Sequence, residues 1–165
     1  METNKTYNKY IFQAMDSYPY NLEATIESLN TAISFDSNNS LALGLLARVY
    51  AEQLHQYKSA IVLYNRALKI NLNEVSLYPH FINALLWNED WDQAQKLINY
   101  ALKVKGVDKG LIHLKQAMLF EYKQHYKKAL KWAEKARELS FNDAQITHIN
   151  IEINRIQCKI DKFKN

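Results

Sequence analysis

"KSAIVLYNRALKIN", residues 58–71, places two of its smallest residues, Ala60 and Ala67, on the most apolar side of a helix-forming segment. Tyr64 stands between them. Larger side chains would bury more apolar surface at these positions. Alanine is instead expected where a second helix crosses closely, because a larger residue would overpack the crossing. The stretch therefore predicts a pair of closely packed helices.

The same pattern recurs along the chain at intervals of 35, 34 and 35 residues. The second alanine of the stretch, Ala67, belongs to a series with Ala32, Ala101 and Ala136. Seven residues before each of these stands Thr25, Ala60, Ala94 or Ala129. Three residues earlier stands Leu22, Tyr57, Trp91 or Tyr126. A fixed period near 34 residues, made of two helices, is typical of a stacked helical solenoid.

The repeat resembles the tetratricopeptide repeat (TPR) family. Residues 43–72 match the family pattern best, through Leu43, Leu46, Ala47, Tyr50, Ala60 and Tyr64. Two departures are a leucine, Leu72, in place of the family's proline, and about one extra residue near 54–56. The resemblance implies an all-α fold, an α-solenoid of antiparallel helix pairs in a right-handed superhelix. It implies one domain, 1–165, with repeats at about 5–37, 40–73, 76–106 and 108–141 and a capping helix at 143–163.

Capping chemistry predicts the helix boundaries. Ser40 is expected to cap a helix, since its hydroxyl can accept a hydrogen bond from a free backbone N–H. Pro79 fits only the first turn of a helix, where its missing N–H costs nothing, so that helix is expected to start at Leu77 after a cap at Ser76. Gly106 is expected to end a helix. Further caps are expected at Asp90, Asp108 and Asn142.

The composition suits a helical protein in a reducing compartment. Of 165 residues, 48% are hydrophobic and only five are glycine or proline, the residues that punctuate sheets. A single cysteine, Cys158, excludes an intramolecular disulfide. Neither a signal peptide nor an apolar run of about 20 residues for a membrane span is present. These features predict a cytoplasmic protein without a membrane partner.

The last helix is expected to carry one apolar stripe, formed by Ile146, Ile149, Ile153, Ile156, Ile160 and Phe163. The favoured interpretation is a capping helix that covers the final repeat. The alternative is a coiled-coil seam, which would make the protein a weak dimer rather than a monomer. The stripe spans fewer than three heptads, which favours the cap.

The residue types that catalysis or cofactor binding would need do not occur at the spacings typical of such sites. The three glycines lack a phosphate-loop spacing, and no two of the five histidines have metal-ligand spacing. The carboxylates Glu89, Asp90 and Asp92 cluster at a helix start, where such residues cap. The sequence therefore predicts no enzyme, no cofactor and no metal.

What remains is the surface. In the TPR family the first helix of each pair lines a concave groove that receives a peptide or helix of a partner protein. Carried over by helix face, the groove candidates are Arg48, Glu52, His80, Asn83, Trp87, Lys115, Met118, Glu121 and Tyr122. Two of them, Trp87 and Tyr122, fit equally a place in the groove or a place between neighbouring repeats. The carboxylate clamp of some family members is incomplete here, because Gly44, Leu45 and Leu111 stand where it would need polar residues.

Basic residues are concentrated near the C-terminus. Residues 1–100 have a net charge of −3, whereas residues 101–165 have +7. Lys127, Lys131 and Lys135 recur every four residues around Trp132, which suggests nucleic-acid binding as the alternative function. A solvated outer face is favoured instead, because second helices form the convex side and Glu134 and Glu138 dilute the charge. Nucleic acid is therefore not the expected partner.

Overall fold

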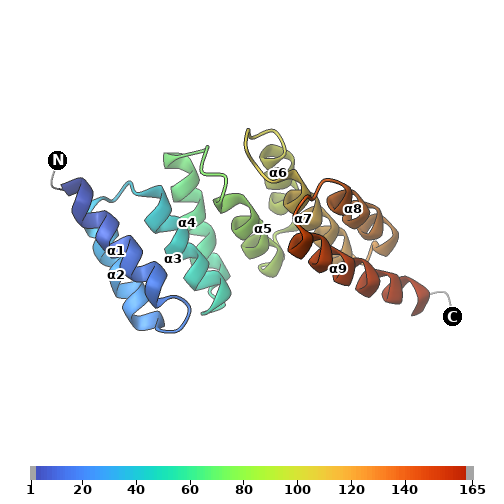
Figure 1. Cartoon of the computed structure of the whole chain (residues 1–165), viewed down its shortest axis with the longest axis horizontal. Helices are drawn as coiled ribbons and strands as arrows, with labels where there is room; N and C mark the ends of the chain where they lie inside the picture. Colours follow the sequence, from blue (N-terminus) through green and yellow to red (C-terminus); the bar gives the residue numbers. More distant parts are fainter. Residues whose placement is uncertain (1–2, 163–165) are drawn as a thin grey trace. The chain divides into compact units, whose positions relative to one another are not determined.

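The computed structural model describes the backbone of residues 3–162 and the side chains of residues 9–162. Phe163, the expected end of the last apolar stripe, lies outside this range. Residues 3–162 form nine α-helices and no strand (Figure 1). In chain order these are α1 (Thr3–Ser17), α2 (Leu22–Phe35), α3 (Ser40–Glu52), α4 (Tyr57–Ile70), α5 (Leu77–Trp87), α6 (Trp91–Ala101), α7 (Lys109–Tyr122), α8 (Tyr126–Glu138) and α9 (Asp143–Lys162). The predicted all-α fold is confirmed.

The chain divides into two compact units, Met1–Ala84 and Leu85–Asn165, with the boundary inside α5. Unit 1 and unit 2 denote these two parts below, and each is described by itself. The predicted single domain and its repeat limits remain predictions.

Unit 1 is built from helix hairpins. α1 packs on α2, α3 packs on α4, and α2 joins the two pairs by packing on α3 (Figure 1). The crossing residues Ala60 and Ala67 are fully buried, as expected. Tyr64, between them, stacks on Phe81 of α5 with ring centroids 5.2 Å apart. Gly44 lets α3 approach the start of α5, since a Cβ there would lie 2.2 Å from a methyl carbon of Leu77.

Unit 2 repeats this construction. α6 packs on α7, α7 packs on α8, and α8 packs on α9. Ala94 and Ala129, the predicted crossing residues of this unit, are fully buried. The side-chain amides of Gln95 and Gln116 exchange two hydrogen bonds of 2.8 Å between α6 and α7. The predicted burial of these alanines is confirmed in both units.

The repeat period is also visible in the backbone. The residues with left-handed φ after α3, α5 and α7 are His55, Glu89 and Gln124, with φ of 54°, 61° and 59°. Such a residue commonly ends a helix, and the backbone N–H that follows it bonds back to a carbonyl near the helix end. This bond spans five residues after α5 and α7 but six after α3, from Gln56 to Tyr50. The extra residue predicted near 54–56 is therefore present in this turn.

The predicted caps are partly confirmed. α7 and α9 begin after Asp108 and Asn142, whose side chains accept backbone hydrogen bonds of 2.9 and 3.1 Å. The cap of α3 is Asn39 rather than Ser40, because the Asn39 amide oxygen accepts from Ala42 N at 2.9 Å. Ser40 is already the first helical residue. The prediction at Ser40 was wrong by one position.

Three boundaries around α5 and α6 show how local competition decides a cap. α5 starts at Leu77 as predicted, but the Ser76 hydroxyl donates to Glu74 rather than capping the helix. Asp90 precedes α6, yet its carboxylate accepts from Asn88 at 2.7 Å and makes no capping bond. The expectation that Gly106 ends a helix was wrong, since α6 already stops at Ala101 and Gly106 lies in the following loop.

The last helix, α9, caps unit 2. Ile149, Ile156 and Ile160 are buried, and Ile153 packs half-buried against the same core as α8. The described residues of the apolar stripe thus pack largely within the chain, as the capping interpretation expects, and the choice between cap and dimer seam stays a prediction. Cys158 lies exposed, off the stripe. None of the described helices is both long enough and apolar enough to cross a membrane.

Candidate binding site on the first helices

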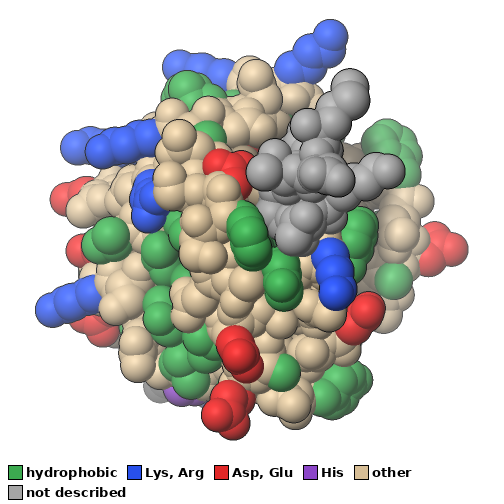
Figure 2. Space-filling view, turned by 90° about the vertical axis from the view of Figure 1, so that its left-hand side faces the viewer, with side chains coloured by type: hydrophobic (Ala, Val, Ile, Leu, Met, Phe, Trp, Pro, Cys, Tyr) green, Lys and Arg blue, Asp and Glu red, His purple; other side chains and the backbone are tan. Residues whose placement is uncertain are grey.

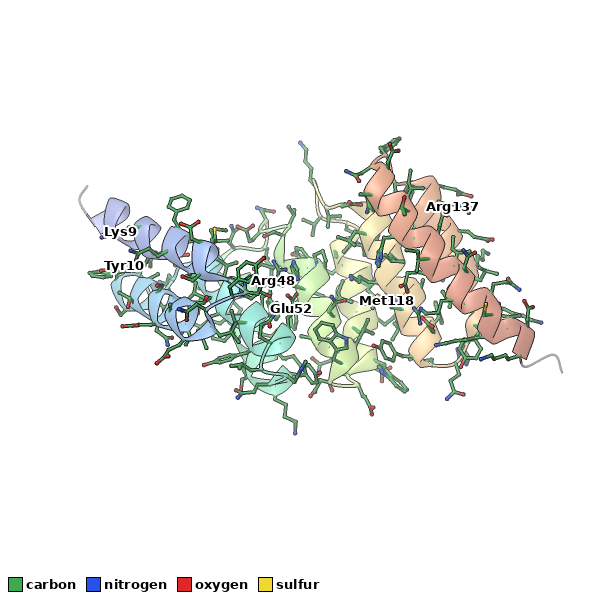
Figure 3. All side chains as sticks on the ribbon, turned by 60° about the horizontal axis from the view of Figure 1, so that its bottom comes forward. Lys9, Tyr10, Arg48, Glu52, Met118 and Arg137 are labelled. Carbon is green, nitrogen blue, oxygen red and sulfur yellow. The ribbon has the colours of Figure 1, made fainter. Side chains whose placement is uncertain are left out.

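Three of the predicted groove residues in unit 1 meet around one carboxylate, that of Glu52 at the end of α3. Arg48 Nε donates to Glu52 Oε2 at 2.8 Å, and His80 Nδ1 of α5 lies 2.9 Å from Oε1. The hydroxyl of Tyr18, which follows α1, donates to Oε2 at 2.9 Å. Arg48 and Glu52 lie next to one another on α3 in Figure 3. The carboxylate thereby links α3 with α5 and with the turn after α1, and these four residues are called the Glu52 cluster below.

The cluster keeps Glu52 ionised. Burial would raise the pKa of Glu52, but hydrogen bonds from His80, Arg48 and Tyr18 outweigh burial and lower the pKa to about 2. Burial also raises the pKa of Tyr18, whose hydroxyl additionally accepts from Gln53 Nε2 at 3.1 Å. The site is therefore a fixed arrangement of an anion and its donors over the physiological pH range.

Arg48 is positioned on two sides. Its Nε is bound to Glu52, and its guanidinium carbon lies 5.3 Å from the centre of the Tyr18 ring, within the range of a cation–π contact. Its two terminal nitrogens, Nη1 and Nη2, form no hydrogen bond with any described residue. The side chain remains 38% exposed. The protein thus holds a guanidinium in place and leaves four of its five N–H donors unused.

Two buried polar groups of unit 1 lack a partner among the described residues. Tyr64 is fully buried and its hydroxyl makes no hydrogen bond there. Burial, followed by the charge of Glu52, raises the pKa of Tyr64 above the usual range. The predicted groove residue Asn83 is half-buried, and its amide oxygen is likewise unpaired.

A small pocket adjoins the cluster. Its volume is about 220 Å³, and it is lined by Ala14, Met15, Tyr18, Thr25, Leu45, Arg48 and Val49. These residues come from α1, α2 and α3 and from the turn after α1. Apart from Arg48, Tyr18 and Thr25, every lining side chain is apolar. The pocket is called the α1–α3 pocket below.

In unit 2 the corresponding carboxylate, Glu121, is covered by α9. Glu121 accepts a two-pronged hydrogen bond from Arg155, with Nη2 2.8 Å from Oε2, and a further bond from Lys159 at 2.7 Å. Arg155 also pairs with Glu152. Only 8% of the Glu121 side chain is exposed. This predicted groove residue is therefore already occupied by the chain's own last helix.

The other candidates of unit 2 lie around Glu121 or are covered. Lys115 is buried, with its ammonium 3.9 Å from the sulfur of Met118. Met118, labelled in Figure 3, and the exposed Tyr122 line a cavity of about 140 Å³ together with Glu121 and the two cations of α9. Trp87, near the end of α5, is half-buried.

Sequence reasoning missed Tyr18, Arg155 and Lys159. The repeat period could have revealed two of them. Tyr18 contacts Glu52, and Arg155 contacts Glu121, across 34 residues in each case. Tyr18 directly follows α1 and Arg155 lies in α9. The groove residues that the family resemblance implies lie in repeats 2 to 4 alone, so the resemblance pointed to neither residue.

The exposed face of α8 in unit 2 carries both signs of charge. Lys127, Lys131 and Lys135 are exposed on α8, and so are Glu134 and Glu138 on the same helix. A mixed surface of this kind has a weak field. Over the described residues, no three His, Cys, Asp or Glu side chains are arranged to hold a metal ion.

Comparison with known proteins supports the fold. No protein-family model and no curated protein sequence matches this chain. A solved structure of MamA residues 41-end from Desulfovibrio magneticus RS-1 matches 99% of this chain and 93% of that one, with a TM-score of 0.70 and 14% sequence identity. A MamA RS-1 double mutant matches 99% and 92% of the two chains, with a TM-score of 0.68 and 13% identity. Likeness at this level of identity shows a shared helical solenoid fold.

Proposed function

We propose that this chain is a non-enzymatic protein-interaction module that binds a peptide or helix of a partner on the first-helix face of unit 1. One observation carries this proposal. The Glu52 cluster fixes Arg48 beside an apolar pocket and leaves its terminal donors unused. The period near 34 residues and the buried crossing alanines support placing the helix pairs in the TPR family.

Preorganisation of Arg48 favours binding at this site. A flexible arginine loses side-chain entropy when it binds a partner, whereas an arginine already held by a carboxylate and an aromatic ring has lost much of it on folding. The neighbouring pocket offers an apolar anchor. At about 220 Å³ it is smaller than the roughly 300–1,000 Å³ of sites for drug-sized molecules, so it suits one side chain of a polypeptide better than a metabolite.

The same geometry disfavours acid–base catalysis by Glu52. A general base works best with a pKa near the operating pH. Glu52, with a pKa of about 2, is too weak a base to remove a proton efficiently and stays too ionised to donate one. Its hydrogen bonds position other groups instead.

A random-peptide display library screened against the full chain tests this function. We expect peptides to be enriched whose affinity falls about tenfold or more when Arg48→Ala or His80→Ala is introduced. Both side chains are partly exposed, so these truncations should leave the helix content seen by circular dichroism unchanged.

The matched control is Lys127→Ala with Lys131→Ala, two exposed changes on α8. These should leave peptide affinity unchanged. The proposed function is wrong if no peptide is enriched. It is also wrong if binding depends on the α8 lysines and not on Arg48 or His80.

A further inference from the structure

The α1–α3 pocket is chemically uneven. Ala14, Met15, Leu45 and Val49 give it apolar walls. The one hydroxyl among its aliphatic lining residues, that of Thr25, donates to the carbonyl of Asn21 at 2.7 Å and is therefore already paired. A bound group would meet hydrocarbon within the pocket. Apolar side chains are favoured there, because their burial is driven by the loss of apolar surface from water.

Arg48 contributes the polar group of the pocket lining that still has unused hydrogen-bond donors. Its guanidinium is a planar fork, and Nη1 and Nη2 carry the donors that no described residue uses. Carboxylates match this fork, often with two parallel hydrogen bonds. Since Nε and the Tyr18 ring already fix the plane of the guanidinium, the direction from which a carboxylate can approach is also fixed.

We propose that the α1–α3 pocket is the anchor site of the binding face. It takes one large apolar side chain of a partner segment, while Arg48 binds an Asp or Glu side chain close to it in the same segment. This inference rests on the proposed function and specifies the partner's chemistry. A single carboxylate suits the site better than a doubly charged phosphate, because the ionised Glu52 lies beside Arg48.

A comparison of the cations in the two units favours unit 1 as the anchor site. There, the cations near Glu121 are already committed, since Arg155 and Lys159 bind that carboxylate. Any carboxylate of a partner would have to compete with Glu121 for them. Arg48 also pairs with a glutamate, but only through Nε, and its outer donors remain available.

The probe is a random-peptide library displayed with its C-terminus fused to the carrier, so that no terminal carboxylate is offered. We expect the enriched peptides to share a Leu, Ile, Met or Phe with an Asp or Glu within about four positions, the separation of neighbours on one helix face. One enriched peptide is then synthesised with an amidated C-terminus. Replacing its acidic residue by the amide should weaken binding to the wild-type chain about tenfold.

A double-mutant cycle assigns this effect to Arg48. The same acid-to-amide change in the peptide should have little effect on binding to Arg48→Ala, because the guanidinium that distinguishes the two is absent. Leu45→Trp should fill the pocket and weaken every enriched peptide about tenfold or more. Since Leu45→Trp risks disturbing the fold, Met15→Glu provides a second test. Met15 is 47% exposed, and a glutamate there would repel the peptide's carboxylate.

The outcomes separate the two proposals. Enriched peptides that show no acidic preference, or that bind Leu45→Trp and Met15→Glu unchanged, overturn the anchor site and leave the interaction function standing. Peptides that depend on Tyr122 and not on Arg48 also overturn it. A library that yields no binder rejects both proposals.

Discussion

Glu52 and Glu121 occupy equivalent places two repeat periods apart, each near the end of a first helix. Each carboxylate is bound by a residue one period away, Tyr18 for Glu52 and Arg155 for Glu121. The donors differ in kind. Glu52 is bound by a phenol, an imidazole and an arginine of its own helix, whereas Glu121 is bound by two cations of α9.

The face around Glu52 in unit 1 is therefore still accessible, whereas the face around Glu121 in unit 2 is covered by α9. In unit 1 the donors bind Glu52 and still leave a pocket and the outer nitrogens of Arg48 accessible. In unit 2 the repeat ends, and α9 covers the face that another repeat would otherwise cover. The same position in the repeat therefore holds a partly exposed cluster in one unit and binds the last helix in the other.

The largest effect is expected from removing the cations of α9. Arg155→Ala with Lys159→Ala leaves the Glu121 carboxylate buried without its partners, which should lower the free energy of unfolding by about 2–4 kcal/mol. The lower end reflects the partial exposure of both cations. Urea unfolding measures the loss, and hydrogen exchange should show α9 opening first. Lys127→Ala with Lys131→Ala removes the same charge from an exposed face, and a similar loss there would contradict the account.

The acid stability of unit 1 should depend on Glu52. Its pKa is about 2 in the folded chain against 4.5 for a free glutamate, so its contribution is complete above pH 4.5 and is lost as the pH falls toward 2. After allowance for partial exposure, this amounts to about 1–2 kcal/mol. Glu52→Gln should remove this part of the pH dependence, measured by urea unfolding as a function of pH. An unchanged pH profile would show that the cluster does not hold the carboxylate.

As the pH is lowered, unit 2 should begin to lose stability at a higher pH than unit 1, because of His113. Burial, with the charges of Lys135 and Lys109, lowers the pKa of His113 below the 6.5 of a free histidine. The unfolded chain therefore binds a proton more readily, and stability falls as the pH drops below 6.5. His113→Phe should keep the stacking on Trp132 and flatten this pH dependence, measured through hydrogen exchange of α7 and α8. A variant with the wild-type profile would contradict the prediction.

The smallest effect is expected at Tyr64. Its buried hydroxyl has no partner in the described part of the chain, so Tyr64→Phe should leave thermal stability unchanged or raise it by up to about 1 kcal/mol. Tyr78 is the matched control, since it is equally buried and its hydroxyl donates to Leu72 O at 2.6 Å. Tyr78→Phe should cost about 1 kcal/mol. Equal losses in both variants would show that Tyr64 is hydrogen-bonded after all.

Much of the fold was predictable because its signals are local. A small residue at every crossing, repeated at a fixed period, identifies the helix pairs without knowledge of their packing. The caps were predicted less well, since adjacent polar residues such as Asn39 and Ser40 compete for the same N–H groups. The outcome depends on backbone angles that the sequence does not show.

The candidate site was predictable only where the repeat is regular. Arg48, Glu52 and His80 come together because equivalent positions of neighbouring repeats share one face. Tyr18 and Arg155 escaped prediction because each contributes through the docking of a helix that departs from the repeat pattern. Tertiary contact decides which carboxylate stays accessible, and no short motif encodes it.

The central claim is that the first-helix face of unit 1 binds a partner while α9 occupies that of unit 2. Hydrogen–deuterium exchange of the full chain, with and without a saturating enriched peptide, tests it most directly. We predict added protection in α1 and α3, around Tyr18 and residues 45–52, and unchanged exchange in α7 and α9. Protection confined to α7, or faster exchange of α9 as the peptide displaces it from Glu121, would contradict the account.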